Sequence, residues 1–217
     1  MRRTKIFSQI FSFFTRPLNF RFKGQISDRN EIGRWIELLA SMDENKIIVE
    51  IGAWNGLGSS KMIVRGLRNR RLRDSRAVGF ESNQDLYAVA KKNLRRHSDY
   101  QLVYGSVVRE DELDKSNLTE IEKGWLASDI EDLSQVPFCL DQVPDEIDLM
   151  ILDGGEFSTF AEFAKLNSRV RNWIVLDDTN TRKCQRILAE LSQDSPWKVV
   201  FLSDERNGTA VLKRLAN

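Results

Sequence analysis

The chain has 217 residues, of which 41% are hydrophobic and 30% are charged. This composition is typical of one globular domain with a full hydrophobic core and excludes a disordered or fibrous chain. The net charge is +1, so the overall charge gives no reason to expect a nucleic-acid partner. The two cysteines, Cys139 and Cys184, lack the spacing of a metal site and fit a reducing compartment, which predicts a cytoplasmic protein.

Residues 1–26 form a basic segment ahead of the main domain. Residues 1–24 carry six basic side chains and no acidic one, and their apolar residues are spaced along one face of a helix. Polar interruptions argue against a secretory signal, and no apolar run of the chain approaches the ~20 residues that cross a bilayer. A basic amphipathic helix over residues 1–22 would lie peripherally on a membrane surface or pack against a second subunit, and the sequence leaves both alternatives open.

Strands and helices alternate along residues 27–217. Asp28 and Glu31 have the spacing of a capping box, which predicts that the first helix begins there. Nine acids and three bases between residues 109 and 132 predict an acidic helical insertion, which we extend over 109–140. Apolar runs predict strands over 46–51, 77–80, 101–104, 147–152, 173–176, 197–202 and 208–213. Helical periodicity predicts the intervening helices over 59–70, 84–96, 160–170 and 182–191.

This alternation predicts an α/β fold built from βαβ units. The last two strands flank Asn207-Gly208, a pair of residues typical of a tight antiparallel hairpin. We therefore expect a seven-stranded, mostly parallel, doubly wound sheet with an antiparallel C-terminal hairpin strand.

Residues 47–60, IIVEIGAWNGLGSS, carry the most informative motif of the chain. A short apolar strand leads into a turn with three glycines and then into a helix, whose free N–H groups can hold a ligand. The glycine spacing is G-x-x-x-G-x-G, which differs from the G-x-G-x-x-G of dinucleotide pyrophosphate sites. Glu50 would repel a pyrophosphate but could pair with an ammonium group, so the motif favours an amino-acid moiety.

These residues resemble the first motif of the class I S-adenosylmethionine-dependent methyltransferases. The resemblance implies that Glu50 and the loop that follows it face the methionine part of the cofactor. It also implies that Ser82 lies near the adenosine and Ser106 near the adenine. The loop residues in question are Gly52, Ala53, Trp54, Gly56, Ser59 and Ser60.

Polar side chains follow the predicted strands at the point where each strand ends. They are Glu50, Glu81, Ser106, Asp153, Asp177 and Asp178. Because the carboxyl ends of parallel strands meet at one edge of the sheet, we expect these side chains to lie together. An acid at Glu81 can accept hydrogen bonds from both hydroxyls of a ribose, in a methyltransferase or in a dehydrogenase.

The segment LMILDGG, residues 149–155, resembles the fourth motif of small-molecule O-methyltransferases. Relatives often have a histidine where this chain has Glu156, so we expect the catalytic candidates to be Asp153, Glu156 and Asp178. Catechol-type members hold a divalent cation with an Asp after the fourth strand and an Asp-Asn pair after the fifth. Asp153 and Asp178 match two of these ligands and predict a Mg²⁺ or other divalent cation site, whereas Thr179 stands at the Asn position. The alternative is that these acids cap the helices that follow.

The motifs together predict an S-adenosylmethionine-dependent methyltransferase that transfers a methyl group to a hydroxyl of a small molecule or a glycan. Some families with a similar first motif are associated with surface polysaccharide synthesis, which suggests glycan modification and would suit a peripheral membrane location. Two alternatives stay open: an NAD-dependent oxidoreductase, and a non-catalytic cofactor-binding partner subunit. A metal-dependent hydroxylase-like member of the same fold is a related alternative.

Overall fold

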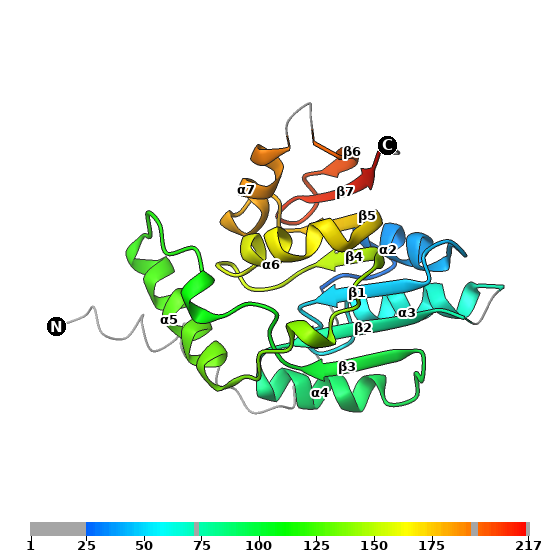
Figure 1. Ribbon diagram of the computed structural model, residues 1–217, viewed down its shortest axis with the longest axis horizontal. Helices are drawn as coiled ribbons and strands as arrows, with labels where there is room; N and C mark the ends of the chain where they lie inside the picture. Colours follow the sequence, from blue (N-terminus) through cyan, green and yellow to red (C-terminus); the bar gives the residue numbers. More distant parts are fainter. Residues whose placement is uncertain (1–24, 72–73, 192–194, 216–217) are drawn as a thin grey trace.

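The computed structural model describes residues 25–71, 74–191 and 195–215. Its centre is a seven-stranded sheet with the strand order β3-β2-β1-β4-β5-β7-β6 (Figure 1). The first five strands run parallel, and β7 pairs antiparallel with both β5 and β6, as the sequence predicted. The strands are β1 (Ile47–Ile51), β2 (Arg76–Glu81), β3 (Tyr100–Tyr104), β4 (Ile147–Leu152), β5 (Val170–Asp177), β6 (Trp197–Ser203) and β7 (Thr209–Arg214).

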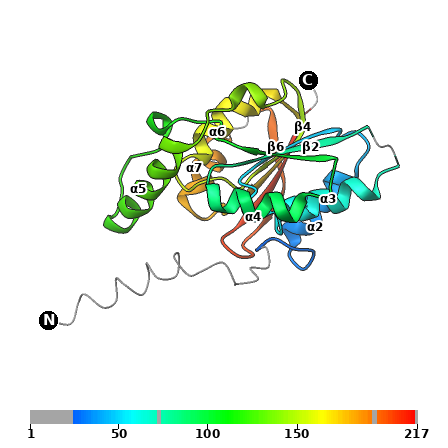
Figure 2. The same cartoon turned by 90° about the horizontal axis from the view of Figure 1, so that it is seen from below.

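Helices cover both faces of this sheet, which confirms the doubly wound α/β fold (Figure 2). The buried apolar residues of α2, α3 and α4 pack with Ile48 and Leu149 on one face. Those of α6 and α7 pack with Val49 and Met150 on the other face. The helices are α2 (Glu31–Ser41), α3 (Ser59–Asn69), α4 (Gln84–Leu94), α5 (Glu120–Gln135), α6 (Thr159–Leu166) and α7 (Arg182–Glu190), with 3-10 turns η1 (Glu110–Glu112), η2 (Leu140–Gln142) and η3 (Asn167–Arg169).

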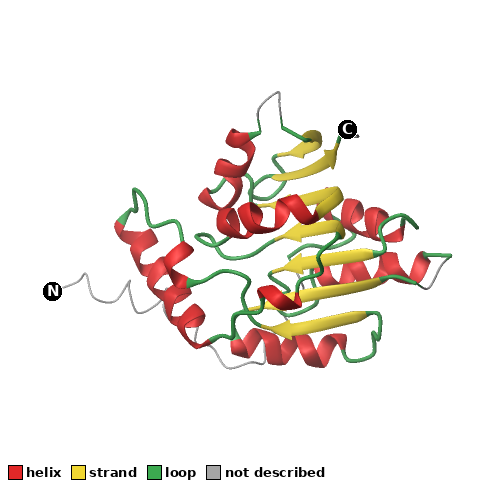
Figure 3. Cartoon of the chain, in the orientation of Figure 1, coloured by secondary structure: helices red, strands yellow, loops and turns green. Residues whose placement is uncertain are grey.

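The predicted acidic insertion contains η1 and α5 and ends at the first residue of η2. Figure 3 shows α5 set apart from the sheet, on the side towards which the parallel strands point. Thr119 caps α5 by accepting a hydrogen bond from the backbone N–H of Glu122, and Glu122 bonds back to Thr119. A small apolar cluster around Leu126 and Phe157 holds the insertion against the domain. The insertion therefore lies where it can form a wall beside the strand ends.

Two predicted helix ends are wrong. Asp28 and Glu31 form no capping box, because Asn30 is the residue before α2 and makes no side-chain cap. Asp28 accepts a hydrogen bond from Arg65 instead, and Glu31 accepts one from Ser203. The helix predicted over 160–170 ends at Leu166, and Val170 is already the first residue of β5.

The predicted N-terminal segment lies almost entirely outside the described residues, so its contact with a membrane or a second subunit stays a prediction. Its last residue, Ile26, is 2% exposed and packs in the core with α2. Within the described part of the chain, no helix is both long and apolar enough to cross a membrane.

Candidate active site at the carboxyl edge of the sheet

A cavity of about 460 Å³ lies at the carboxyl ends of the parallel strands. It lies where the strand order reverses between β1 and β4, the position at which ligands bind in open α/β sheets. Nine of the residues expected at a site line it: Gly52, Ala53, Trp54, Ser59, Glu81, Ser82, Ser106, Asp153 and Asp178. Four others are not among its lining residues: Glu50, Gly56, Ser60 and Glu156.

The loop between β1 and α3 depends on the glycine at its start. Gly52 has φ +87°, and a Cβ atom there would lie 2.0 Å from the backbone oxygen of Asp153. The loop after β1 therefore touches the end of β4, which it could not do with any larger residue. Gly58 precedes α3, so the first N–H groups of that helix begin beside the cavity that Gly58 and Ser59 line.

Glu50 lies beneath this loop and does not line the cavity, contrary to the expectation that it faces a cofactor. Its side chain is fully buried, and Oε2 accepts hydrogen bonds from Ser60, at 2.8 Å, and from the hydroxyl of Tyr100. Within the described part of the chain, Oε1 has no hydrogen-bond partner. Burial raises the pKa of Glu50 to about 7, and the surrounding hydroxyls oppose that rise only in part.

Tyr100 reaches Glu50 because the strand between them carries a glycine. Tyr100 lies on β3 and Glu50 on β1, and Gly79 of β2 lies between them. A Cβ atom at Gly79 would lie 1.9 Å from the Tyr100 hydroxyl oxygen. These three residues support the first loop from below, a role that the sequence motif alone did not reveal.

Glu81, at the end of β2, is fixed beside the cavity by backbone groups. Oε2 accepts from the N–H of Trp54, at 2.6 Å, and Oε1 accepts from the N–H of Asn83, at 2.8 Å. Each carboxylate oxygen can accept a second hydrogen bond, so the group remains able to bind ligand hydroxyls. Burial raises the pKa of Glu81 to about 7.

Ser82 and Ser106 lie at the ends of neighbouring strands and both line the cavity. The hydroxyl of Ser106 donates to the carbonyl of Val108, at 2.9 Å, and accepts from the same residue's N–H, at 3.2 Å. This is the local turn of a strand end, so the structure assigns Ser106 a turn-forming role beside the cavity.

Glu156 follows β4 in the chain, but its side chain contacts the start of α7 and does not line the cavity. Its carboxylate accepts hydrogen bonds from the hydroxyl of Thr181 and the backbone N–H of Lys183, both at 3.3 Å. These are the contacts of an acid that stabilises a helix N-terminus. Glu156 therefore helps to stabilise the N-terminus of α7, which is not the helix that follows it in the chain, and its catalytic role stays a prediction.

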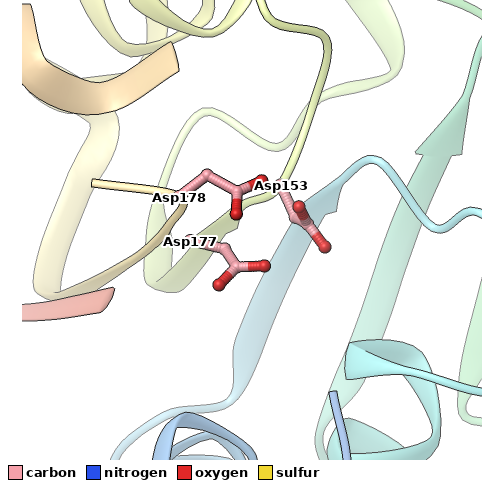
Figure 4. Close-up of side chains that lie close together, drawn as sticks. All are labelled: Asp153, Asp177 and Asp178. Carbon is pink, nitrogen blue, oxygen red and sulfur yellow. The ribbon is translucent and has the colours of Figure 1, made fainter. Parts of the chain in front are cut away.

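Three carboxylates meet where β4 and β5 end. Asp153, Asp177 and Asp178 each offer an oxygen, and these oxygens lie within 4.8 Å of one another (Figure 4). Asp177 is 1% exposed, and burial raises its pKa to about 7. Three negative charges this close require neighbouring positive charge to stay ionised.

That positive charge comes from Lys183 and Arg206, two residues that the sequence analysis missed. The Lys183 ammonium lies 2.5 Å from Oδ1 of Asp153 and 3.1 Å from Oδ2 of Asp178. The Arg206 guanidinium lies 3.0 Å from Oδ2 of Asp177. Burial opposes the charged form of Lys183, but the carboxylates outweigh it and raise the pKa of the ammonium above its usual range.

One signal in the sequence could have indicated Lys183. It lies in the first turn of the helix that follows the acidic strand end, and helical side chains lean towards the N-terminus of their helix. Arg206 had no comparable local signal, because the turn between β6 and β7 brings it back to the end of β5. The same turn brings Asn207, whose amide donates to Oδ1 of Asp178 at 3.1 Å.

The insertion supplies the outer wall of the cavity with further acids. Asp129 and Asp132 of α5 line it, and Asp132 accepts from the side chain of Asn83. Burial raises the pKa of Asp129 to about 6. The lining includes six acids and two bases: Glu81, Asp129, Asp132, Asp153, Glu162 and Asp178 against Lys183 and Arg206. Such a cavity favours a ligand that carries positive charge and disfavours a phosphate.

Comparison with solved structures places this arrangement among known folds. A methyltransferase from Geobacter sulfurreducens is similar over 98% of this chain and 87% of its own, with a TM-score of 0.60 and 17% identity. An O-methyltransferase from Bacillus cereus, solved with S-adenosylhomocysteine (SAH), is similar over 97% and 90%, with a TM-score of 0.60 and 14% identity. An rRNA methylase from Streptococcus thermophilus is similar over 88% and 99%, with a TM-score of 0.54 and 13% identity.

The chain has the class I methyltransferase fold. No protein-family model matches the sequence, and no curated protein matches it. Members of this fold differ in what they methylate, as the rRNA methylase illustrates, so the acceptor has to be argued from the cavity itself.

Proposed function

We propose that the protein is an S-adenosylmethionine-dependent methyltransferase that methylates a hydroxyl group of a small molecule or a glycan. The observation that carries the proposal is the fixed carboxylate of Glu81 beside the Gly52 loop, at the switch point of a class I methyltransferase fold. S-adenosylhomocysteine in the Bacillus cereus structure supports the cofactor assignment by similarity of fold.

The lining residues suit the parts of this cofactor. Glu81 would accept hydrogen bonds from the ribose hydroxyls, with Ser82 and Ser106 beside the adenosine. The start of α3, at Gly58 and Ser59, favours a carboxylate such as that of methionine. The acidic lining suits the positive charges of the amino group and the sulfonium.

Asp153 is the residue that we assign as the base. Its Oδ1 binds Lys183, whereas Oδ2 has no hydrogen-bond partner among the described residues, and the side chain is 23% exposed at the cavity. The sulfonium supplies an activated methyl group when the cofactor is bound. The acceptor oxygen forms the new bond to the methyl carbon, the electron pair of the carbon–sulfur bond stays on sulfur, and Asp153 takes the hydroxyl proton.

The two alternatives that the sequence left open find less support. An NAD-dependent oxidoreductase would have to hold a pyrophosphate in a cavity lined by six acids and two bases. A non-catalytic partner subunit has no need of a carboxylate oxygen held open at the cavity by a buried ammonium. The class of acceptor, a small molecule or a glycan, belongs to the proposal and is more specific than the similarity of fold.

Isothermal titration of the full chain with S-adenosylhomocysteine and, separately, with NAD tests the proposal. We expect saturable one-to-one binding of S-adenosylhomocysteine and at least about tenfold weaker binding of NAD, because the acids repel the pyrophosphate. Preferential binding of NAD would overturn the methyltransferase assignment in favour of the oxidoreductase. Binding of neither ligand would remove the support for a cofactor site in this cavity.

A further inference from the structure

The three carboxylates at the ends of β4 and β5 have the spacing of a metal site, but two cations already neutralise them. Lys183 lies between Asp153 and Asp178, and Arg206 pairs with Asp177. The Lys183 side chain is 5% exposed, so its charge lies within the site and not at the surface. The five side chains together leave one net negative charge where the carboxylates alone would leave three.

A divalent ion does not fit this arrangement. Mg²⁺ requires several oxygen ligands at about 2.0–2.1 Å. Oδ1 of Asp153 and Oδ2 of Asp178 hold the ammonium, which leaves only Oδ2 of Asp153 and Oδ1 of Asp177 without a partner among the described residues. The remaining oxygen of Asp178 accepts from Asn207. An ion on either of the unpartnered oxygens would bind a carboxylate that already pairs with Lys183 or Arg206, and that positive charge would repel it.

The amide side chain next to the predicted ligand set is engaged with another residue. Thr179 follows Asp178, and the next residue, Asn180, donates its side-chain amide to Asp204 of the β6–β7 turn at 3.2 Å. The metal site predicted from Asp153 and Asp178 is therefore not supported by the side chains around them.

We propose that the ammonium group of Lys183 is the built-in cation of this site, in place of a divalent metal ion, and that it binds the acceptor's oxygen. An ammonium group has three N–H donors, and within the described part of the chain two of them go to Asp153 and Asp178. Lys183 lines the cavity, so the third donor is available to a ligand there.

This role rests on the proposed methyl transfer to a hydroxyl. A hydroxyl beside Lys183 and Asp153 would accept a hydrogen bond from the ammonium and donate one to the free carboxylate oxygen. The fixed positive charge would stabilise the negative charge that develops on the acceptor oxygen as its proton leaves. A metal ion supplies the same stabilisation in other sites, and here the side chain would make it unnecessary.

Titration of the full chain with Mn²⁺, monitored by electron paramagnetic resonance, tests whether Lys183 takes the place of a divalent ion. It needs no knowledge of the acceptor. We expect no saturable Mn²⁺ binding by the wild type up to about 1 mM ion, because the ammonium holds one oxygen each of Asp153 and Asp178 and repels the ion. Lys183→Met removes the charge, and we expect it to bind Mn²⁺ at least about tenfold more tightly than the wild type. Lys183→Arg keeps a positive charge and should behave as the wild type does.

Lys165→Met is the matched control, because Lys165 also pairs with a carboxylate, Glu112 at 2.6 Å, but away from the three aspartates. We expect it to leave Mn²⁺ binding unchanged. Saturable binding of Mn²⁺ by the wild type would overturn the proposal, and so would a folded Lys183→Met variant that gains no binding. Circular dichroism checks the fold, and the wild-type and Lys183→Arg results decide the question if Lys183→Met does not fold.

The outcome is separable from that of the proposed function. Binding of S-adenosylhomocysteine together with tight wild-type binding of Mn²⁺ would leave a methyltransferase with a metal site and contradict the role of Lys183. Failure to bind S-adenosylhomocysteine would contradict the methyltransferase assignment, whatever the Mn²⁺ result.

Discussion

The ammonium nitrogen of Lys183 lies 2.5 Å from Oδ1 of Asp153, which joins the first turn of α7 to the end of β4. The contact connects a helix with a strand of the sheet through two residues that lie 30 positions apart in the chain. The same ammonium also reaches Asp178, so it offsets the charge of two of the three aspartates. The chemistry proposed for the cavity depends on this pair.

Asp153→Asn should abolish the base while keeping the shape of the side chain. We expect methyl transfer to fall by about 10²-fold or more, because a general base contributes about that much. Binding of S-adenosylhomocysteine should stay within about threefold of the wild type, since the proposed donor contacts are made by other residues. Transfer of labelled methyl from S-adenosylmethionine to a panel of hydroxyl acceptors measures the first quantity, and calorimetry measures the second. An equally active variant would exclude Asp153 as the base.

Gly52→Ala should destabilise the fold. The new Cβ atom would meet the backbone of Asp153 at 2.0 Å, and φ at this position is +87°. We expect the free energy of unfolding to fall by roughly 2–4 kcal/mol, as measured by urea denaturation.

Gly124→Ala is the control for this substitution. Gly124 lies within α5, and a Cβ atom there meets nothing within 4 Å. Alanine in a helix interior should stabilise it by about 0.5–1 kcal/mol. Equal changes in the stability of the two variants would contradict the conclusion that position 52 requires glycine because the loop lies so close to β4.

Glu50→Gln should reveal the cost of burying this carboxylate. Burial raises the pKa of Glu50 from its ordinary value of 4.5 to about 7 in the folded protein. The folded state therefore binds the proton more tightly than the unfolded chain does. The stability that this proton contributes is present below about pH 4.5 and is lost as the pH rises through about 7. The wild type should therefore lose roughly 1–3 kcal/mol relative to Glu50→Gln between about pH 5 and about pH 8.

Urea denaturation of both proteins at the two pH values measures this difference. Burial also raises the pKa of Glu81 to about 7, so Glu81 adds to the pH dependence of stability. This contribution is the same in the wild type and in Glu50→Gln, so the difference between the two proteins reports on Glu50 alone. Parallel stability curves for the two proteins would show that Glu50 is ionised alike in the folded and unfolded states.

The order of strands and helices could be predicted from the sequence because local patterns specify it. Apolar runs such as Ile147–Leu152 are buried along their whole length, which matches a parallel strand covered on both faces. The ends of elements were less certain, because they depend on tertiary partners. Asp28 is satisfied by Arg65, which lies 37 residues further along the chain, and so it does not cap α2.

The residues of the site were predictable where they follow a strand directly, as Glu81 and Asp153 do. Glu50 was misplaced because it lies within the strand, where side chains alternate between the two faces. Its neighbours Val49 and Ile51 pack on the α6 and α7 side, so Glu50 projects under α3 and not towards the edge. Lys183 and Arg206 were missed because their positions depend on how a helix and a hairpin return to that edge.

Calorimetric titration of Glu81→Gln with S-adenosylhomocysteine tests most directly whether this cavity holds the methyl donor. The substitution keeps the shape of the side chain but removes the charge that would accept two ribose hydroxyls. We expect binding at least about tenfold weaker than that of the wild type. Glu120→Gln, at the exposed start of α5, is the matched control and should bind as the wild type does. Equal affinity of Glu81→Gln and the wild type would contradict the account.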